Sequence, residues 1–470
     1  MIPLRQGYGG QVGARAAAVR VLVAVERGQT TLADELERAR TDLADRRDRA
    51  LMFEIAAGVL RWRQALDAVL ARASSRPLDT LDPAVRAILR AGAYQLRHLD
   101  RVPPHAVVNE SVETARLAGQ KRAAGFVNAV LRAMLRSGSA AGLPARPASL
   151  EDREGWLAYL SIALSHPEWL ATRWLDRYGA DAAERWCRFN NTPPRVTFRL
   201  RPGVDRTTFL ARLAAADVPA EPGAYTADGV NVLAGGTGRL PPELRDDAVI
   251  QDEGSQLVGQ VAAGCRGARV LDLCASPGGK TMLLSESTPR PAQVVACDLR
   301  PTRIALLRTM LERGQRPATL EGGPRPDIVR LDAGAPLPFG AVFDTVLLDA
   351  PCSGLGTLRR DPDLKWSRRP ADLEALAASE RRLLDHAATA VRPGGALVYA
   401  TCSSEPEENE LVVAAFLAAH PDFAAAPVSF PPAVTGAAEL VDAEGRLQTL
   451  PFRHDLDAFF AAVLRRREAP

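Results

Sequence analysis

The regular alternation of short apolar runs with helical patterns between residues 256 and 467 limits the fold more than any other feature of the chain. Helical spacing fills most of the intervals, as over residues 372–391. Six apolar runs have the length of buried strands: residues 269–273, 294–298, 328–331, 345–349, 396–401 and 459–464. Strands that alternate with helices pair in parallel, because each helix returns the chain to the same end of the sheet. We therefore predict an α/β doubly wound, Rossmann-like domain over residues 256–470.

The N-terminal part of the chain shows helical periodicity throughout. Apolar residues there recur three and four positions apart, which is the period of a helix with one buried face. Asp82 followed by Pro83 is typical of a helix start, because Asp caps free amide groups and proline suits the first helical position. We predict an all-α bundle of six or seven helices over residues 1–136 and a Gly- and Pro-rich linker over residues 137–149.

Residues 150–255 combine a helical start with a strand, and they predict a small α+β domain. Apolar residues alternate with polar ones over residues 195–200, so that Arg195 and Arg199 share one face of the strand. Two interpretations of this face stay open. It contacts the phosphates of RNA, or it is an exposed sheet face that binds nothing.

The positive charge of the chain is concentrated at its N-terminal end. Residues 1–150 carry 23 Arg and Lys against 14 Asp and Glu, a net charge of +9, whereas residues 151–470 carry 36 against 42, a net charge of −6. Such an excess is expected of a module that meets a polyanion. Solvated helix faces explain it equally well.

Composition excludes several other classes of protein. No apolar run approaches the ~20 residues that span a bilayer, and the start of the chain lacks the apolar stretch of a signal peptide. The six cysteines include no C-x-x-C pair, which argues against a disulfide framework and against a Cys-rich zinc module. We expect a cytoplasmic protein with no membrane partner and no metal.

A glycine-containing turn and several acids follow the predicted strands. The turn, residues 274–281 (CASPGGKT), has Cys274 where a Walker A loop needs glycine, and the dinucleotide pattern G-x-G-x-x-G is absent. Asp298, Asp332 and Asp349 each stand at or just after the end of a strand. Because an acid at such a position can bind ribose hydroxyls, a cofactor that contains a nucleoside but no triphosphate fits best.

Two cysteines follow neighbouring strands at the same edge of the predicted sheet. Cys352 lies in the string DAPCSG and Cys402 in TCSS, each beside small or turn-forming residues. A free cysteine is most often a small buried apolar residue, and we interpret Cys265 and Cys297 in that way. Two cysteines after adjacent strands instead predict a pair of thiols that face one pocket.

Several of these strings resemble the Sun/nucleolar type of RNA cytosine-5 methyltransferases, which use S-adenosyl-L-methionine. The N-terminal helices resemble the RNA-binding antitermination factor NusB, and the order of the parts is similar to that of the bacterial enzymes that act on 16S rRNA. The strings that carry the resemblance are residues 125–131 (GFVNAVL), 165–170 (SHPEWL), 251–256 (QDEGSQ), 274–281, 349–354, 360–366 (RDPDLKW) and 401–403. Ser276 and Ala458 depart from the usual Ala and Gly of the family.

The resemblance implies a role for each site residue. Cys402 would be the nucleophile that attacks carbon 6 of cytosine, Cys352 the thiol that helps to release the product, and Asp349 a catalytic acid between cofactor and base. Asp298 would bind the ribose hydroxyls and Asp332 the adenine amine. The cofactor-binding residues would be Cys274, Ala275, Ser276, Pro277, Gly278, Gly279, Lys280, Asp298, Arg303, Asp332 and Asp349.

Lysine is so rare in this chain that its positions carry information. Only three of the 59 cations are lysines: Lys121, Lys280 and Lys365. We expect Lys280 or Lys365 to lie near the nucleophile, because a neighbouring ammonium favours the thiolate.

The substrate stays open at this point. We expect RNA, and 16S rRNA in particular, as the partner of a monomeric enzyme, with 5-methylcytosine as the product. The same motifs are equally compatible with a target cytosine in tRNA or at another site of rRNA. A non-catalytic RNA-binding factor would need neither cysteine, and an RNA remodeller driven by a nucleoside triphosphate would need a Walker A loop.

Overall fold

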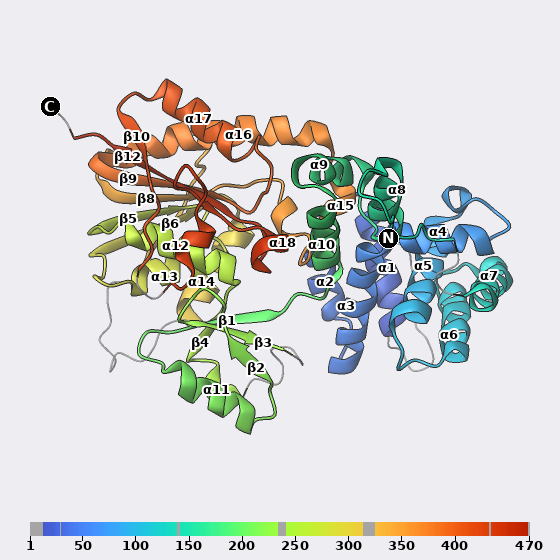
Figure 1. Cartoon of the computed structure of the whole chain (residues 1–470). Coiled ribbons are helices and arrows are strands. Elements are labelled where there is room, and N and C mark those ends of the chain that lie inside the picture. The colour runs from blue at the N-terminus through green and yellow to red at the C-terminus, as the bar shows by residue number, and fades with distance from the viewer. Residues whose placement is uncertain are drawn as a thin grey trace. The chain divides into compact units, whose positions relative to one another are not determined.

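The computed structural model describes residues 13–28, 30–138, 142–233, 241–313, 325–431 and 434–468 (Figure 1). The chain divides into two compact units, here called unit 1 and unit 2. Unit 1 contains residues 1–193 and the inserted segment 358–368, and unit 2 contains the rest. The first twelve residues, on which the expectation about a signal peptide rests, and part of the expected linker lie outside the described residues.

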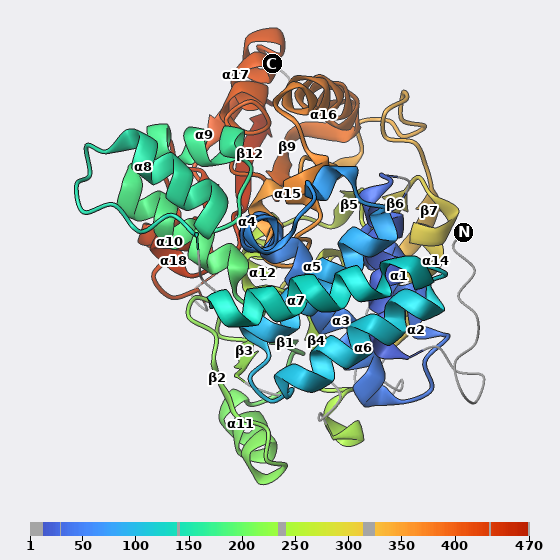
Figure 2. The ribbon, with the colours of Figure 1, turned by 90° about the vertical axis from the view of Figure 1, so that its right-hand side faces the viewer.

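Unit 1 begins with seven α-helices, as the periodicity predicts. They are α1 (Ala14–Glu26), α2 (Leu32–Arg40), α3 (Arg46–Arg61), α4 (Arg63–Ala73), α5 (Pro83–His98), α6 (Pro104–Leu117) and α7 (Ala124–Ser137). The Asp82 carboxylate accepts a hydrogen bond of 2.8 Å from the amide of Ala84, which confirms the predicted cap of α5. Helices α6 and α7 lie side by side in Figure 2.

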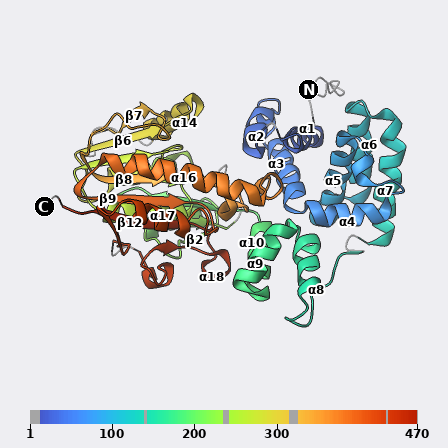
Figure 3. The ribbon, with the colours of Figure 1, turned by 90° about the horizontal axis from the view of Figure 1, so that it is seen from above.

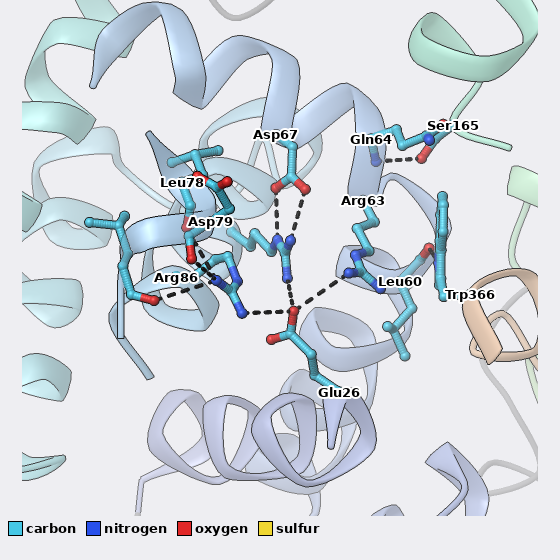
Figure 4. A network of polar contacts seen from close by, with 12 residues as sticks. Glu26, Leu60, Arg63, Gln64, Asp67, Leu78, Asp79, Arg86, Ser165 and Trp366 are labelled. Atoms are coloured by element: carbon cyan, nitrogen blue, oxygen red, sulfur yellow. Dashed lines mark hydrogen bonds and ion pairs between the residues drawn. The ribbon is translucent and has the colours of Figure 1, made fainter. Parts of the chain in front are cut away.

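A polar network joins three of these helices beside their apolar core (Figure 4). Glu26, at the end of α1, pairs with Arg86 and Arg90 of α5 at 3.1 Å each and with Arg63 of α4 at 3.5 Å. Arg90 also forms a two-pronged ion pair with Asp67. Burial alone would raise the pKa of Glu26, but the three guanidinium groups outweigh it and lower the pKa. The ionised carboxylate therefore fixes α1 against α4 and α5.

The expected α+β segment, residues 150–255, is divided between the two units after Pro193. Its helices α8 (Arg153–Ala158), α9 (Glu168–Tyr178) and α10 (Ala180–Asn191), and the single π turn Tyr159–Ala163, belong to unit 1. Trp174 of α9 and Trp186 of α10 stack with ring centroids 4.6 Å apart. Helical packing therefore continues beyond residue 136, and the domain boundaries expected from the sequence stay a prediction.

Unit 2 starts with a four-stranded antiparallel sheet in the order β2-β3-β1-β4. The elements are β1 (Val196–Leu200), α11 (Arg206–Ala215), β2 (Ala220–Pro222), β3 (Gly229–Val232) and β4 (Ala248–Ile250). Phe198 and Leu200 are buried with Phe209 of α11, so the predicted apolar face of β1 is confirmed.

The opposite face of β1 corrects the sequence analysis. Arg199 is only 3 % exposed, pairs with Glu286 at 2.8 Å and donates to Gln251 at 2.9 Å. Both interpretations of this residue are therefore wrong: it neither reaches RNA phosphates nor lies on an open face. Arg195 is about half exposed and pairs with Glu221 and Asp455.

The main sheet of unit 2 contains all six predicted strands and has the order β10-β12-β9-β8-β5-β6-β7. The strands are β5 (Arg269–Leu273), β6 (Gln293–Asp298), β7 (Asp327–Arg330), β8 (Phe343–Asp349), β9 (Val391–Thr401), β10 (Phe423–Ala426), β11 (Leu447–Gln448) and β12 (Phe460–Arg466). The strands β9, β8, β5, β6 and β7 pair in parallel with their neighbours. Strand β12 pairs antiparallel with both β9 and β10. The chain order reverses between β5 and β8, and ligands of such sheets bind at that switch point.

Helices cover both faces of this sheet. Helices α16 (Pro370–Ala390) and α17 (Glu410–Ala419) pack on one face, which is turned toward the viewer in Figure 3. Helices α12 (Glu253–Gly264), α13 (Gly279–Glu286) and α14 (Pro301–Arg313) pack on the other, with the short helix α18 (Pro451–His454) nearby (Figure 1). Among the described residues, no helix is both long enough and apolar enough to cross a membrane.

Candidate active site

The switch point between β5 and β8 gathers most of the residues singled out in the sequence. The turn 274–278 follows β5, Asp298 ends β6, Asp349 ends β8 and Cys402 follows β9. All of these elements belong to unit 2. Because parallel strands point the same way, their carboxyl ends bring these side chains to one edge of the sheet.

Two residues of the turn after β5 have a backbone with positive φ. Cys274 has φ of 60°, and Gly278 has φ of 112°, where a side chain would be strained. A Cβ on Gly278 would also lie 2.8 Å from a methyl carbon of Leu307. The amide of Ser276 donates to the carboxylate of Asp298 at 3.2 Å, which fixes the turn beside the end of β6.

The three strand-end acids differ in their surroundings. Asp298 is 5 % exposed and also accepts a hydrogen bond from the amide of Leu299 at 2.8 Å, with Arg303 3.9 Å away. Asp332 is exposed, and its carboxylate accepts from the amide of Gly334 at 2.8 Å. Asp349 is half-buried and lies against Lys280.

Lys280 is the ammonium group of the site. Its Nζ lies 2.9 Å from Oδ2 of Asp349. Burial opposes the charge of Lys280, but Asp349, Asp272 and Cys402 outweigh it, so the pKa of Lys280 is raised. The charge interaction between Lys280 and Cys402 agrees with the expectation that one of the rare lysines lies near this cysteine.

Lys365 does not share this role. Its ammonium is buried in unit 1 and donates to the backbone oxygens of Arg61 and Ser165 and to the side chain of Asn191. Because all three N–H donors have partners within that unit, the expectation that Lys365 activates a cysteine is wrong.

The two cysteines lie next to each other. The sulfur atoms of Cys352 and Cys402 are 3.3 Å apart, and both residues are partly buried. The hydrogen bond with Cys402 and burial raise the pKa of Cys352, and the acids Glu408 and Glu380 add to the effect. The raised pKa favours the thiol form of Cys352, and either sulfur can be the donor of the hydrogen bond between the two cysteines.

The loop that carries Cys352 is also pinned at its far end. The amide of Gly356 donates to the carbonyl of Cys402 at 3.0 Å, and the carbonyl of Gly356 accepts from Ala458 at 2.9 Å. A Cβ on Gly356 would lie 2.1 Å from the oxygen of Ala458, so the close approach needs glycine. Ala458 itself is buried in this contact.

One acid of the site escaped the sequence analysis. Asp272 lies inside β5, is fully buried and accepts a hydrogen bond of 2.6 Å from Thr281. Burial, with the charges of Asp349 and Asp298, raises the pKa of Asp272 to about 7. The available signal was a single acid in the middle of an apolar strand, which is costly unless it has a function or a partner.

The string at residues 251–256 has a structural role within unit 2. The Glu253 carboxylate accepts hydrogen bonds from the amides of Ala224, Tyr225 and Thr226 at 2.6 to 3.2 Å. Gln251 accepts from Arg199 and lies next to Gly279 at the start of α13. The string therefore joins the small sheet to the turn after β5.

Within the described residues, no group of three or more His, Cys, Asp or Glu side chains could hold a metal ion.

Comparison with known families divides the chain into three matched parts. A family model described as "16S rRNA methyltransferase RsmB/F" matches residues 263–465. A model of the NusB family matches residues 13–136, and a model described as a "Methyltr_RsmF/B-like, ferredoxin-like domain" matches residues 166–236. The fold class predicted from the sequence is thereby confirmed: a NusB-like helical part, a small α+β part and a Rossmann-like methyltransferase part.

Relatives match over most of their length. "Probable ribosomal RNA small subunit methyltransferase B" of Bacillus subtilis is 34 % identical over 422 residues, which is 90 % of this chain and 91 % of that protein. "Ribosomal RNA small subunit methyltransferase B" of Pseudomonas putida is 36 % identical over 411 residues, covering 87 % and 89 % of the two chains.

Solved structures share the fold. The crystal structure of PH0851 has a TM-score of 0.75 at 22 % identity and covers 97 % of this chain and 99 % of its own. The structure of NSun6 from Pyrococcus horikoshii with SFG has a TM-score of 0.54 at 18 % identity and covers 64 % and 99 %.

Proposed function

We propose that this chain, which belongs to the 16S rRNA methyltransferase RsmB/F family, methylates carbon 5 of a cytosine in 16S rRNA. S-adenosyl-L-methionine would be the methyl donor. The family makes the chain an RNA methyltransferase. The observation that supports the carbon-5 position is the pair of sulfur atoms 3.3 Å apart at Cys352 and Cys402, beside the Lys280–Asp349 ion pair.

The charges at the switch point suit the proposed donor. Burial raises the pKa of Asp272, and the charges of Asp349 and Asp298 add to that shift, so the three acids lie within reach of one another. Such a cluster of acids repels a triphosphate but attracts a cation and can accept hydrogen bonds from hydroxyl groups. When bound, S-adenosyl-L-methionine supplies a methyl group on a positively charged sulfur. The turn 274–280 would hold the methionine end of the donor. Asp298, with Arg303 beside it, would bind the ribose, and Asp332 would bind the adenine.

Cys402 provides the nucleophile in the proposed mechanism. Carbon 5 of cytosine is a poor nucleophile until a thiolate adds to carbon 6, which makes carbon 5 electron-rich. The charges of Lys280 and Cys402 interact, and a positive charge near a thiol favours the thiolate. In its protonated form, Asp349 would donate a hydrogen bond to N3 of the base and accept one from the amine, and so draw electron density from the ring as carbon 6 is attacked.

Cys352 acts after methyl transfer. The hydrogen on carbon 5 must leave as a proton and the bond between Cys402 and carbon 6 must break, which restores the aromatic ring. Cys352 is a protonated thiol in contact with Cys402, so it is placed to donate a proton to the departing sulfur. A solvent base would accept the proton from carbon 5.

RNA would meet this site as an unstacked base. A cytosine inside a helix cannot reach a thiol at a sheet edge, so the target nucleotide must be extruded or lie in a loop. The net positive charge of residues 1–150 would hold the RNA mainly through phosphates, without base specificity.

The test is methyl transfer from labelled S-adenosyl-L-methionine to deproteinised 16S rRNA, with tRNA and 23S rRNA as parallel substrates. We expect label in 16S rRNA and 5-methylcytosine as the labelled nucleoside after digestion. Label at another atom of cytosine would overturn the carbon-5 proposal. Label in tRNA or 23S rRNA alone would overturn the 16S assignment while leaving the chemistry intact.

A further inference from the structure

Glu408 is a buried acid that the proposed mechanism does not use. It lies between β9 and α17 and is 0 % exposed. Its Oε1 accepts a hydrogen bond of 2.6 Å from the amide of Ser353. Its Oε2 accepts from the hydroxyl of Ser353, also at 2.6 Å, and from the hydroxyl of Ser403. A buried carboxylate usually needs a cation nearby, but here hydroxyl and amide donors surround it.

These two serines are the residues that immediately follow the two cysteines. Ser353 comes after Cys352 and Ser403 comes after Cys402, and their hydroxyl oxygens are 3.3 Å apart. One carboxylate therefore ties together two loops that are about 50 residues apart in the chain, at the point where their thiols meet. The other connection between the loops described above, through Gly356, lies four residues beyond Cys352.

A second acid supports Glu408 from behind. Burial, followed by the charge of Glu408 and a hydrogen bond with it, raises the pKa of Glu380 on α16 to about 9. Glu380 is therefore protonated at neutral pH and can donate to Glu408. Tyr399 of β9 donates to Glu380 at 3.2 Å and to the backbone oxygen of Glu408 at 2.5 Å. Burial raises the pKa of Glu408 as well, but the hydrogen bonds from Ser353, Ser403 and Glu380 oppose that shift and favour Glu408 as the acceptor.

We propose that Glu408 is a positioning residue that keeps the thiols of Cys352 and Cys402 in contact by bridging Ser353 and Ser403. The inference rests on the proposed two-thiol function, because only that reaction needs the sulfur atoms close together. Glu408 touches neither substrate nor cofactor in this account. It acts through the loops, and its removal lets the sulfur atoms separate without changing the cofactor turn on β5.

The distance between the thiols can be tested without RNA or cofactor. Diamide oxidises two neighbouring thiols to a disulfide: each thiol loses a proton and an electron, and the N=N bond of diamide takes up both. Peptide mass mapping then measures how fast the bond between residues 352 and 402 forms in the full-length protein. We expect Glu408→Gln to slow its formation by about tenfold or more, because the effective concentration of one thiol near the other falls.

Glu374→Gln is the matched control, because Glu374 is an exposed glutamate on α16. Its rate of disulfide formation should equal that of the wild type. If Glu408→Gln forms the disulfide as fast as this control, or faster, the inference is overturned. Ser403→Ala serves as a second variant if Glu408→Gln does not fold. It removes one hydroxyl of the bridge, and an unchanged oxidation rate in that variant would likewise contradict the proposal.

Kinetics separate this inference from the proposed function. In Glu408→Gln, we expect kcat for RNA methylation to fall by about 100-fold, while the Kd for S-adenosyl-L-methionine stays at the wild-type value. A merely structural role would weaken cofactor binding together with turnover. If the wild type makes no 5-methylcytosine, the proposed function fails, but the oxidation rates still report whether Glu408 sets the distance between the thiols.

Discussion

The two cysteines, seen residue by residue, have different environments although they touch. The hydrogen bond with Cys402, burial and two buried acids raise the pKa of Cys352, whereas the charge of Cys402 interacts with the ammonium of Lys280. A base that enters the site would therefore meet one thiol kept protonated and one thiol next to a cation. This asymmetry is consistent with the proposed roles, attack by Cys402 and release by Cys352.

Replacing Cys402 with alanine should abolish methyl transfer. The fall in kcat should reach at least about 10⁴-fold, because the sulfur that attacks carbon 6 is gone and Cys352 is held protonated. Isothermal titration should give an unchanged Kd for S-adenosyl-L-methionine, since the cofactor residues lie on other loops. Turnover that survives in Cys402→Ala would refute the nucleophile role.

Replacing Cys352 with alanine should trap the reaction after attack. Without the second thiol, Cys402 cannot leave readily, so a covalent complex of enzyme and RNA should accumulate. The complex should survive a denaturing gel and disappear after RNase treatment. The double variant Cys352→Ala/Cys402→Ala is the control and should give no shifted band, and a band in that variant would show that another residue forms the bond.

At the scale of elements, the inserted segment 358–368 has the most unusual placement. It leaves unit 2 after the Cys352 loop, packs within unit 1 and returns to unit 2 at Arg369. Trp366 donates from its ring nitrogen to the carbonyl of Leu60 at 2.7 Å, as Figure 4 shows, and Arg63 stacks 5.3 Å from its ring. Lys365 is the most deeply buried charged group of the segment, and burial lowers the pKa of Lys365 to about 7.

The pH dependence of stability should report on Lys365. Between pH 7 and pH 10.5 the unfolded chain holds a proton on this amine that the folded protein has released, so stability rises with pH in that window. Urea unfolding at pH 7 and pH 9 should show a rise from this group of about 2 kcal/mol. Lys365→Met should lack that part of the rise, whereas the exposed control Lys121→Met should keep it. Equal rises in wild type and Lys365→Met would show that the amine does not titrate there.

At the scale of the whole molecule, the net positive charge belongs to residues 1–150, and RNA binding should depend on that part of the chain. Lys121, Arg122 and Arg136 are exposed at the two ends of α7. Replacing all three with alanine should weaken RNA binding and reduce the slope of log K against log salt by about 0.7 to 0.9 for each phosphate that is no longer neutralised. Filter binding over a salt series measures both. Arg308→Ala, an exposed change on α14, is the control, and an unaltered slope in the triple variant would exclude these residues from the RNA surface.

The sequence by itself determined the features that depend on near neighbours. The strands of the main sheet, the helices of unit 1 and the cap at Asp82 follow from hydrophobic periods and local hydrogen bonds, which act within a few residues. The two cysteines were found because each follows a predicted strand, and parallel strands must end at one edge. Neighbouring strands bring the two loops to the same edge, but the contact of their sulfur atoms also depends on how the loops are held together.

Only the tertiary structure decided the partners of buried polar groups. Arg199 meets Glu286 across 87 residues, Lys365 meets Arg61 across 304, and Ser353 meets Glu408 across 55. A local pattern cannot show which distant group satisfies a buried charge, because that depends on how the elements pack. An arginine on a strand face therefore looked exposed, a lysine in a specific string looked catalytic, and the acid that ties the two thiol loops together carried no signal of its own.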